Sequence, residues 1–171
     1  MKKGLSVPHR KWMGAVSACE KWLYENSFPV DGGNFDDAGR VSGRIKTILK
    51  EMGIENDVVR MAAVITYESE INIVSYARHG MISLHVLPEH VEIEAVDEGP
   101  GISDIRLAMQ QGWSTATDKI REMGFGAGMG LNNIRNFSDI FHISSDVGSG
   151  TRLKMIIHIQ QEQDRGAGDR L

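Results

Sequence analysis

Apolar residues recur at helical spacing near the start of the chain. Between residues 10 and 25 they return every three or four positions, which predicts an amphipathic helix. The stripe consists of Trp12, Ala15, Val16, Cys19, Trp22 and Leu23. We assign residues 1–27 to a helical extension. Its stripe packs either on the extension's own domain or against a second subunit or partner.

Two more helices are expected before the first central strands. The pattern predicts one helix that is capped by Asp36 or Asp37, runs to about Met52 and stops at Gly53. A longer helix follows over residues 56–78. Both have apolar positions on one side, so we expect them to pack on a sheet.

The strands are predicted by alternation of apolar and polar positions. They are residues 28–35 (an edge strand or a loop), 81–86, 91–97, 140–145 and 151–159, and a short helix covers 132–139. Residues 98–130 contain seven glycines and no long apolar run, which is typical of a binding loop or lid. We therefore expect one domain over residues 28–159 and a polar, disordered tail over 160–171.

Composition narrows the class of protein. The chain has 171 residues, 41% of them hydrophobic, which suits one soluble domain with a core. Its net charge of −4 argues against direct binding of nucleic acid through a basic face. The single cysteine forms no internal disulfide, and no apolar run reaches the length of a membrane span. We expect a cytoplasmic protein that does not span a membrane.

A first candidate site follows the strand at 91–97. Asp97 ends this strand, where its carboxylate can accept a hydrogen bond from an amino group such as that of adenine. Gly99 and Gly101 remove side chains where a flat base must approach the backbone. On its own this pattern also fits an ordinary turn.

A second candidate is the glycine run at residues 124–131. It leads into the short helix at 132–139, so several backbone N–H groups and a positive helix end can converge on a phosphate. The spacing matches neither the dinucleotide fingerprint nor a P-loop. A flexible glycine linker is the alternative.

The long helix carries a third candidate. Glu68 and Asn72 are four residues apart and lie on one face, whereas Glu70 points away by roughly 200°. Asn72 offers an oxygen ligand for Mg²⁺, and Glu68 could accept a proton from an attacking hydroxyl. Thr151, after the turn at 148–150, could donate its hydroxyl toward the base. A solvated helix face and an ordinary strand threonine are the alternatives.

All four signals occur in one order, and in that order the chain resembles the GHKL (histidine-kinase-like) ATPases. Glu68 and Asn72 correspond to the N box, and residues 97–101, 126–131 and 148–151 to the three glycine boxes. Residues 97–102, 114–115 and 121–131 are most similar to the bacterial anti-sigma-factor serine/threonine kinases. The resemblance covers residues 28–159.

This resemblance implies an α+β fold, the Bergerat two-layer α/β sandwich, with helices on one face of a mixed, mainly antiparallel sheet. It implies Mg²⁺ and ATP as cofactors, a lid at 112–126, and phosphoryl transfer to a serine or threonine of a small antagonist protein. Glu68 is then the catalytic base and Asn72 the metal ligand. The implied cofactor-binding residues are Asn72, Asp97, Gly99, Gly101, Gly124, Gly126, Gly128, Met129, Gly130, Leu131 and Thr151. The partners are an antagonist, a sigma factor, or both, and a homodimer is possible.

Competing functions remain. A sensor histidine kinase would need a two-helix segment with a phosphoacceptor His-Glu motif, which His9 and Arg10 do not provide. A topoisomerase or chaperone ATPase would need further domains. The main alternative is a nucleotide-gated binding module that sequesters a sigma factor or another regulator without phosphotransfer.

Overall fold

The computed structural model describes residues 22–160, which form a sheet of five strands. They are β1 (Tyr24–Asp31), β2 (His79–Val86), β3 (His90–Asp97), β4 (Ile140–Asp146) and β5 (Gly150–His158). Their order in the sheet is β1-β2-β3-β5-β4, and every pairing among these strands is antiparallel. The sheet is therefore wholly antiparallel in the described chain, whereas the sequence led us to expect a mixed, mainly antiparallel one.

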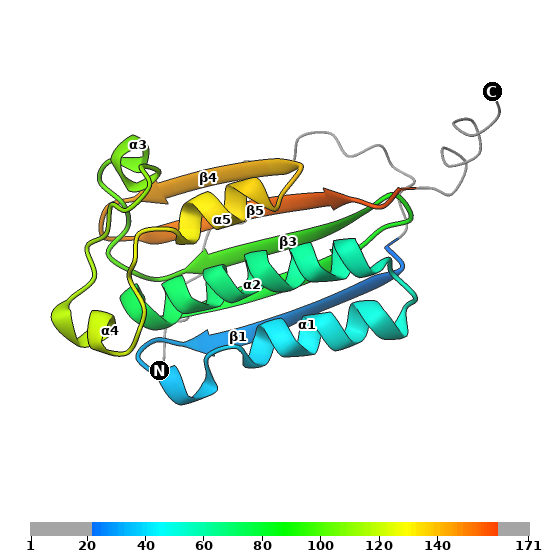
Figure 1. Cartoon of the computed structure of the whole chain (residues 1–171), viewed down its shortest axis with the longest axis horizontal. Helices are drawn as coiled ribbons and strands as arrows, with labels where there is room; N and C mark the ends of the chain where they lie inside the picture. The colour runs from blue at the N-terminus through cyan, green and yellow to red at the C-terminus, as the bar shows by residue number, and fades with distance from the viewer. Residues whose placement is uncertain (1–21, 161–171) are drawn as a thin grey trace, which may run out of the picture.

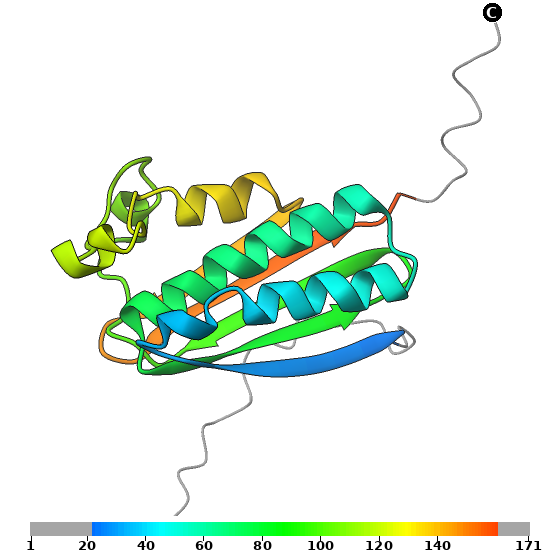
Figure 2. The same ribbon diagram turned by 60° about the horizontal axis from the view of Figure 1, so that its bottom comes forward.

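Helices cover one face of this sheet (Figures 1 and 2). They are the 3₁₀ turn η1 (Phe35–Asp37) and the helices α1 (Arg40–Glu51), α2 (Asn56–Tyr76), α3 (Ile105–Ala108), α4 (Asp118–Glu122) and α5 (Gly130–Asn136). The long helix α2 packs between α1 and α5, while α3 and α4 lie at one end of the sandwich (Figure 1). The expected two-layer arrangement with helices on one face is confirmed.

Strict alternation in the central strands builds the core. Ile82, Leu84 and Val86 of β2 are fully buried under the helices, and their neighbours along the strand point to the other side. Ile93 of β3 and Met155 of β5 continue the same buried layer. This period of two is what a sheet with one covered face requires.

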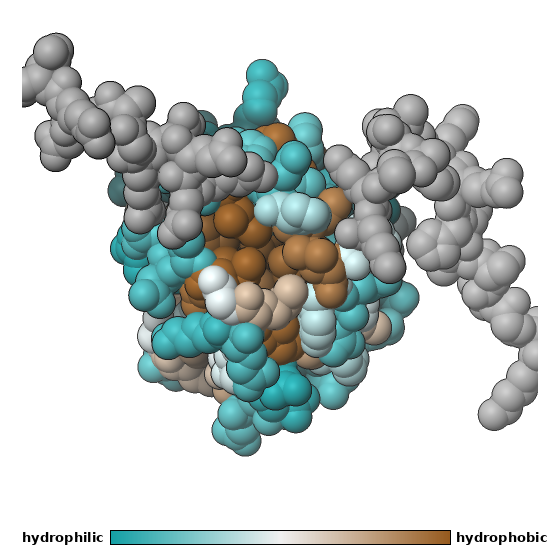
Figure 3. All heavy atoms as spheres, turned by 90° about the vertical axis from the view of Figure 1, so that its right-hand side faces the viewer, coloured by the Kyte–Doolittle hydropathy of each residue, from teal (hydrophilic) through white to brown (hydrophobic). Residues whose placement is uncertain are grey.

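The end of the sandwich opposite α3 and α4 also carries apolar side chains (Figure 3). At this end α1 finishes, α2 begins and β5 finishes (Figure 1). The glycine boxes at residues 97–101 and 126–131 lie at the other end, after β3 and at the start of α5.

The structure corrects several expected boundaries. Residues 24–27, assigned to the N-terminal extension, belong to β1, and Leu23 already donates a backbone hydrogen bond to Val86. The rest of the predicted helix at 10–25 lies almost wholly outside the described residues, as does the tail from 161. Neither Asp36 nor Asp37 caps α1, because a turn at Gly39, with φ of +92°, precedes the helix.

Other expectations hold. The stop at Gly53 and the turn before β5 are present, and an edge strand forms, although it covers Tyr24–Asp31 rather than residues 28–35. The long helix ends at Tyr76 rather than Arg78, because β2 already begins at His79. Within residues 22–160 there is no helix with the length and apolarity of a membrane span.

Candidate functional site

A cavity of about 450 Å³ lies among α2, the end of β3, the glycine-rich segment and the start of α5. Its walls include Ala95 and Leu153 from the sheet and Ile71 from α2, together with the lid residues Trp113 and Phe125. A volume of this order suits a ligand of nucleotide size, and one wall is apolar enough to take a flat base.

The structure brings the sequence-predicted residues together around this cavity. Eleven of the twelve line it: Glu68, Asn72, Asp97, Gly101, Gly124, Gly126, Gly128, Met129, Gly130, Leu131 and Thr151. Gly99 does not. A Cβ on Gly99 would lie 2.8 Å from the Asp97 Oδ1 atom, so this glycine makes room for the carboxylate rather than for a base.

Glu68 and Asn72 converge on the first residue of α5. A Cβ on Gly130 would lie 3.3 Å from Glu68 Oε2 and 3.5 Å from Asn72 Oδ1. The side chain of Asn133, in the first turn of α5, donates a hydrogen bond of 2.7 Å to Glu68 Oε1. The carboxylate is therefore held in place from a second helix. The sequence analysis missed Asn133, because no spacing rule links residues 65 positions apart.

Glu70 has a different position, as the helical geometry predicted, but it is not solvated. The residue is 2% exposed, and its carboxylate accepts hydrogen bonds of 3.1 Å from the backbone N–H groups of both Val41 and Ser42. It thus supplies the cap that Asp36 and Asp37 do not provide, because it satisfies donors in the first turn of α1.

Asp97 sits in a half-buried position at the end of β3. Burial raises the pKa of its carboxyl, while hydrogen bonds from the backbone of Thr151 and Gly99 partly oppose that rise. The two backbone contacts fix the orientation of the carboxylate. Its remaining acceptor capacity faces a cavity that Thr151 also lines.

Ser145 of β4 links the residue after the first glycine box (97–101) to the last box (148–151), and no sequence pattern pointed to it. Its hydroxyl accepts a hydrogen bond of 2.8 Å from the backbone N–H of Ile102. It also donates to the carbonyl of Gly150 at 2.9 Å and shares a 2.9 Å contact with the hydroxyl of Thr151. The Thr151 hydroxyl is therefore held beside the segment that follows Asp97.

The glycine run folds back on the lid. Gly126 and Gly128 have φ values of +81° and +73°, and a Cβ on either would overlap Ala116 or the backbone of Gly112 and Trp113. The backbone N–H of Gly112 donates a 3.0 Å hydrogen bond to the carbonyl of Gly128. These two glycines are thus required by the packing of the segment against itself, and they bring its backbone to the cavity wall.

Phe125 connects the lid to the other side of the domain. Its ring stacks on that of Phe35 in η1, with centroids 5.7 Å apart and an interplanar angle of 26°. Phe35 precedes α1, whose N-terminus is held by Glu70. The lid therefore rests on the same α1–α2 layer that carries Glu68.

Residues 22–160 contain no group of three or more His, Cys, Asp or Glu side chains that could hold a metal ion. A site built by Asn72 with phosphate oxygens and water remains compatible with this, because Mg²⁺ usually keeps several waters and uses few protein ligands.

Comparison with known proteins supports the resemblance that the sequence motifs indicated. The family described as "Histidine kinase-, DNA gyrase B-, and HSP90-like ATPase" matches residues 57–163. The chain is 34% identical over 125 residues to "Serine/threonine-protein kinase RsbT" of Bacillus subtilis (strain 168), which covers 70% of this chain and 85% of the relative. It is 31% identical over 115 residues to "Anti-sigma F factor" of Caldanaerobacter subterraneus subsp. tengcongensis, covering 67% and 68% of the two chains.

A third relative, "Anti-sigma F factor" of Heyndrickxia coagulans, is 39% identical over 69 residues, which is 40% of this chain and 44% of the relative. The family match spans most of the chain and contains all of the cavity's predicted residues. The chain therefore belongs to the family of histidine kinase-, DNA gyrase B- and HSP90-like ATPases.

Proposed function

We propose that this protein is an ATP-dependent serine/threonine protein kinase of the anti-sigma type, which phosphorylates a small antagonist protein. The observation that carries the proposal is the convergence of Glu68 and Asn72 on Gly130, inside the cavity that also contains Asp97. A protein that only bound nucleotide would have no need of a carboxylate held beside the start of α5.

The roles follow from position. Asp97 would accept a hydrogen bond from the adenine amino group, and Thr151 would contribute its hydroxyl at the same end of the cavity. The glycine segment and the start of α5 would direct backbone N–H groups to the phosphates. Asn72 would offer its side-chain oxygen to Mg²⁺, which supplies charge neutralisation at the phosphates when bound.

Glu68 would act on the protein substrate. As the serine or threonine oxygen bonds to the γ-phosphorus, the bond from that phosphorus to the β–γ bridging oxygen breaks and ADP leaves. The hydroxyl proton passes to the Glu68 carboxylate. The hydrogen bond from Asn133 leaves one carboxylate oxygen, Oε2, free of that contact to take the proton.

The setting is also part of the proposal. We propose a protein partner, an antagonist or a sigma factor, and a cytoplasmic location, and we expect no direct contact with nucleic acid. A homodimer stays a prediction from the family resemblance.

The test uses the full chain with labelled ATP and Mg²⁺, and with candidate antagonist proteins as acceptors. We expect label on a serine or threonine of one acceptor, and loss of transfer in Glu68→Ala while Mg-ATP still binds. Unchanged transfer in Glu68→Ala would refute the assignment of the base. Tight nucleotide-dependent binding of a partner with no labelled product would instead support the sequestering module.

A further inference from the structure

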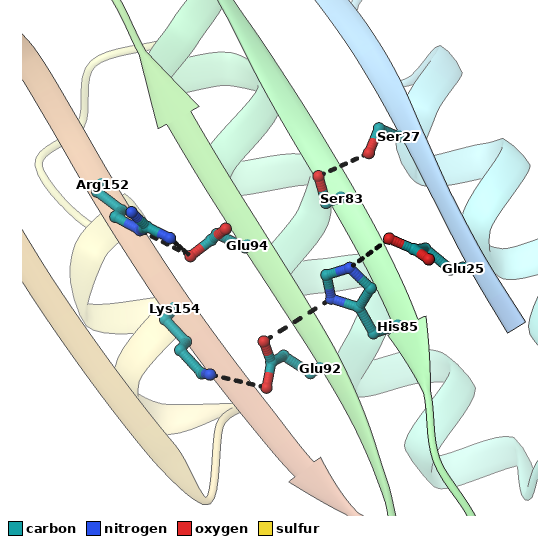
Figure 4. Close-up of polar contacts among 8 residues, drawn as sticks. All are labelled: Glu25, Ser27, Ser83, His85, Glu92, Glu94, Arg152 and Lys154. Carbon is teal, nitrogen blue, oxygen red and sulfur yellow. Dashed lines mark hydrogen bonds and ion pairs between the residues drawn. The ribbon is translucent and has the colours of Figure 1, made fainter. Parts of the chain in front are cut away.

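The side of the sheet away from the helices, here called the outer face, has a polar centre (Figure 4). Glu92 contacts Lys154 at 2.9 Å and Glu94 contacts Arg152 at 2.6 Å, while the imidazole of His85 lies between Glu25 and Glu92. Pairing across strands satisfies these charges, so most of this centre is stable when solvated.

One path over the outer face is different. Next to His85, the hydroxyls of Ser27 and Ser83 share a 2.8 Å contact and present only small side chains (Figure 4). Beyond them Pro29, Met81 and Val96 lie side by side on β1, β2 and β3. Met81 and Val96 are 41% and 38% exposed. This path is a shallow strip with small residues in its middle and apolar residues at its far end.

Trp22 occupies the near end of this path. Its ring lies against that of His85 with centroids 4.5 Å apart, yet 47% of the residue is exposed. Trp22 is the first described residue, so residues 1–21 join the domain on its outer face. An indole that is half covered by the sheet leaves apolar surface for the chain that precedes it.

Residues 1–21 have a charge and a length that suit this path. Residues 1–21 hold five Lys or Arg and one Glu, a net +4, so a chain of net −4 leaves −8 on the remainder. The acidic side chain of Glu25, which is 53% exposed, borders the path, and Glu92 and Glu94 border it as members of ion pairs with Lys154 and Arg152. A helix over residues 10–21 would be ~18 Å long. His85 and Met81 are four strand residues apart, ~14 Å.

We propose that residues 10–21 dock as an amphipathic helix along this path on their own domain. Cys19 would face Ser83, Val16 and Trp12 would face Met81 and Val96 farther along, and the basic residues of the helix would lie beside the acidic border. The outer face would then be closed by the chain's own N-terminal segment rather than by a second copy. This inference does not depend on the proposed kinase activity.

The single cysteine provides a direct test in the full chain. Cys19 lies on the apolar stripe, so docking should slow its reaction with a thiol reagent such as DTNB. A segment docked nine-tenths of the time slows the reaction ~10-fold, because only the open form reacts. The matched control is Ser17→Cys combined with Cys19→Ser, since position 17 lies ~200° away on the helix and should react as fast as in urea.

Location is tested by adding charge to the path. Met81→Lys combined with Val96→Lys should abolish the protection of Cys19, whereas Val147→Lys, at a residue 71% exposed elsewhere, should leave it intact. Circular dichroism melting checks that each variant folds. Equal reactivity at positions 17 and 19 overturns the proposal, as does protection that survives the double substitution. Protection that increases with protein concentration overturns it in favour of a second copy.

Discussion

The carboxylate of Glu68 accepts a 2.7 Å hydrogen bond from the side-chain amide of Asn133. The two residues come from different helices, α2 and α5, and the start of α5 is also where the glycine segment ends. Movement of that segment would therefore reach the proposed base directly. The contact would then couple the orientation of Glu68 to the position of the lid.

Asn133→Ala should lower kcat for phosphotransfer roughly 10- to 100-fold with little change in KM for ATP. The side chain orients the base and is not among the residues that line the cavity, and a hydrogen bond to a charged group is worth about 1.5–3 kcal/mol. Steady-state kinetics with the unphosphorylated acceptor protein measure the separate effects on kcat and KM. Asn136→Ala, exposed on the same helix, is the control and should behave as the wild type. An equal loss in both variants would point to damage to α5 rather than to positioning.

Nucleotide affinity should fall on acidification at a higher pH than an ordinary aspartate would cause. Burial raises the pKa of Asp97, and only the ionised carboxylate accepts a hydrogen bond from adenine without competing as a donor. Calorimetric titration of the nucleotide from pH 7 downward measures the effect. Asp97→Asn should bind weakly at every pH and show only the titration of the nucleotide itself. A parallel pH profile in the two proteins would contradict the role given to Asp97.

Glu70→Ala should destabilise the domain by about 2–4 kcal/mol, because it leaves two buried backbone donors of α1 without an acceptor. Glu70→Gln keeps one acceptor oxygen and should cost less. Urea unfolding followed by circular dichroism gives the free energies. Glu51→Ala, exposed at the other end of α1, should change them by no more than about 0.5 kcal/mol. A cost for Glu70→Ala as small as this control's would refute the capping role.

The stability of the protein should depend on His85 near neutral pH. Interaction with Glu92, reinforced by Glu25, raises the pKa of His85 even though burial opposes it. The folded state therefore holds this proton more tightly. The stabilisation is complete below the unfolded pKa of about 6.5 and is lost as pH rises through the higher folded value.

His85→Gln should remove that part of the pH dependence, as measured by the free energy of unfolding between about pH 6 and 8. Glu92 should cause the opposite change in the free energy of unfolding, a loss of stability at acidic pH. Burial opposes its ionisation, but His85 and Lys154 lower its pKa to about 2, so its contribution is present above about pH 4.5 and disappears toward pH 2. An unchanged slope above pH 6 in His85→Gln would show that another group is responsible.

Gly128→Ala should weaken nucleotide binding more than it weakens the fold. A Cβ there overlaps the backbone of Gly112 and Trp113, so the glycine segment could not pack against the lid. The matched control is Gly33→Ala, which has a similar φ of +77° but open space around it. Both carry the cost of a left-handed residue, about 1–2 kcal/mol, and only Gly128→Ala should also lose affinity in calorimetry. If Gly128→Ala and Gly33→Ala bind the nucleotide with equal affinity, the packing of the glycine segment against the lid is not needed for binding.

The parts of the fold and of the candidate site that could be predicted are those that depend on the spacing of residues close together in the sequence. Alternation located β2, β3 and β5, and helical spacing separated Glu68 and Asn72 from Glu70, because both periods are written into consecutive residues. The order of the glycine motifs then identified the family. Boundaries were less certain: residues 24–27 were assigned to the helical extension, yet they form a strand because β2 offers an edge for pairing.

By itself, the sequence determined most of the residues that share the cavity, all of those predicted except Gly99, since a strand end, a helix face and a glycine run fix their directions locally. Only the tertiary structure decided that Asn133 holds Glu68, that Ser145 links Gly150 to Ile102, and that Glu70 caps α1. Each of these contacts joins residues far apart in the chain, or different strands. The physical reason is that hydrogen-bond partners in a core are set by packing, which no local period encodes.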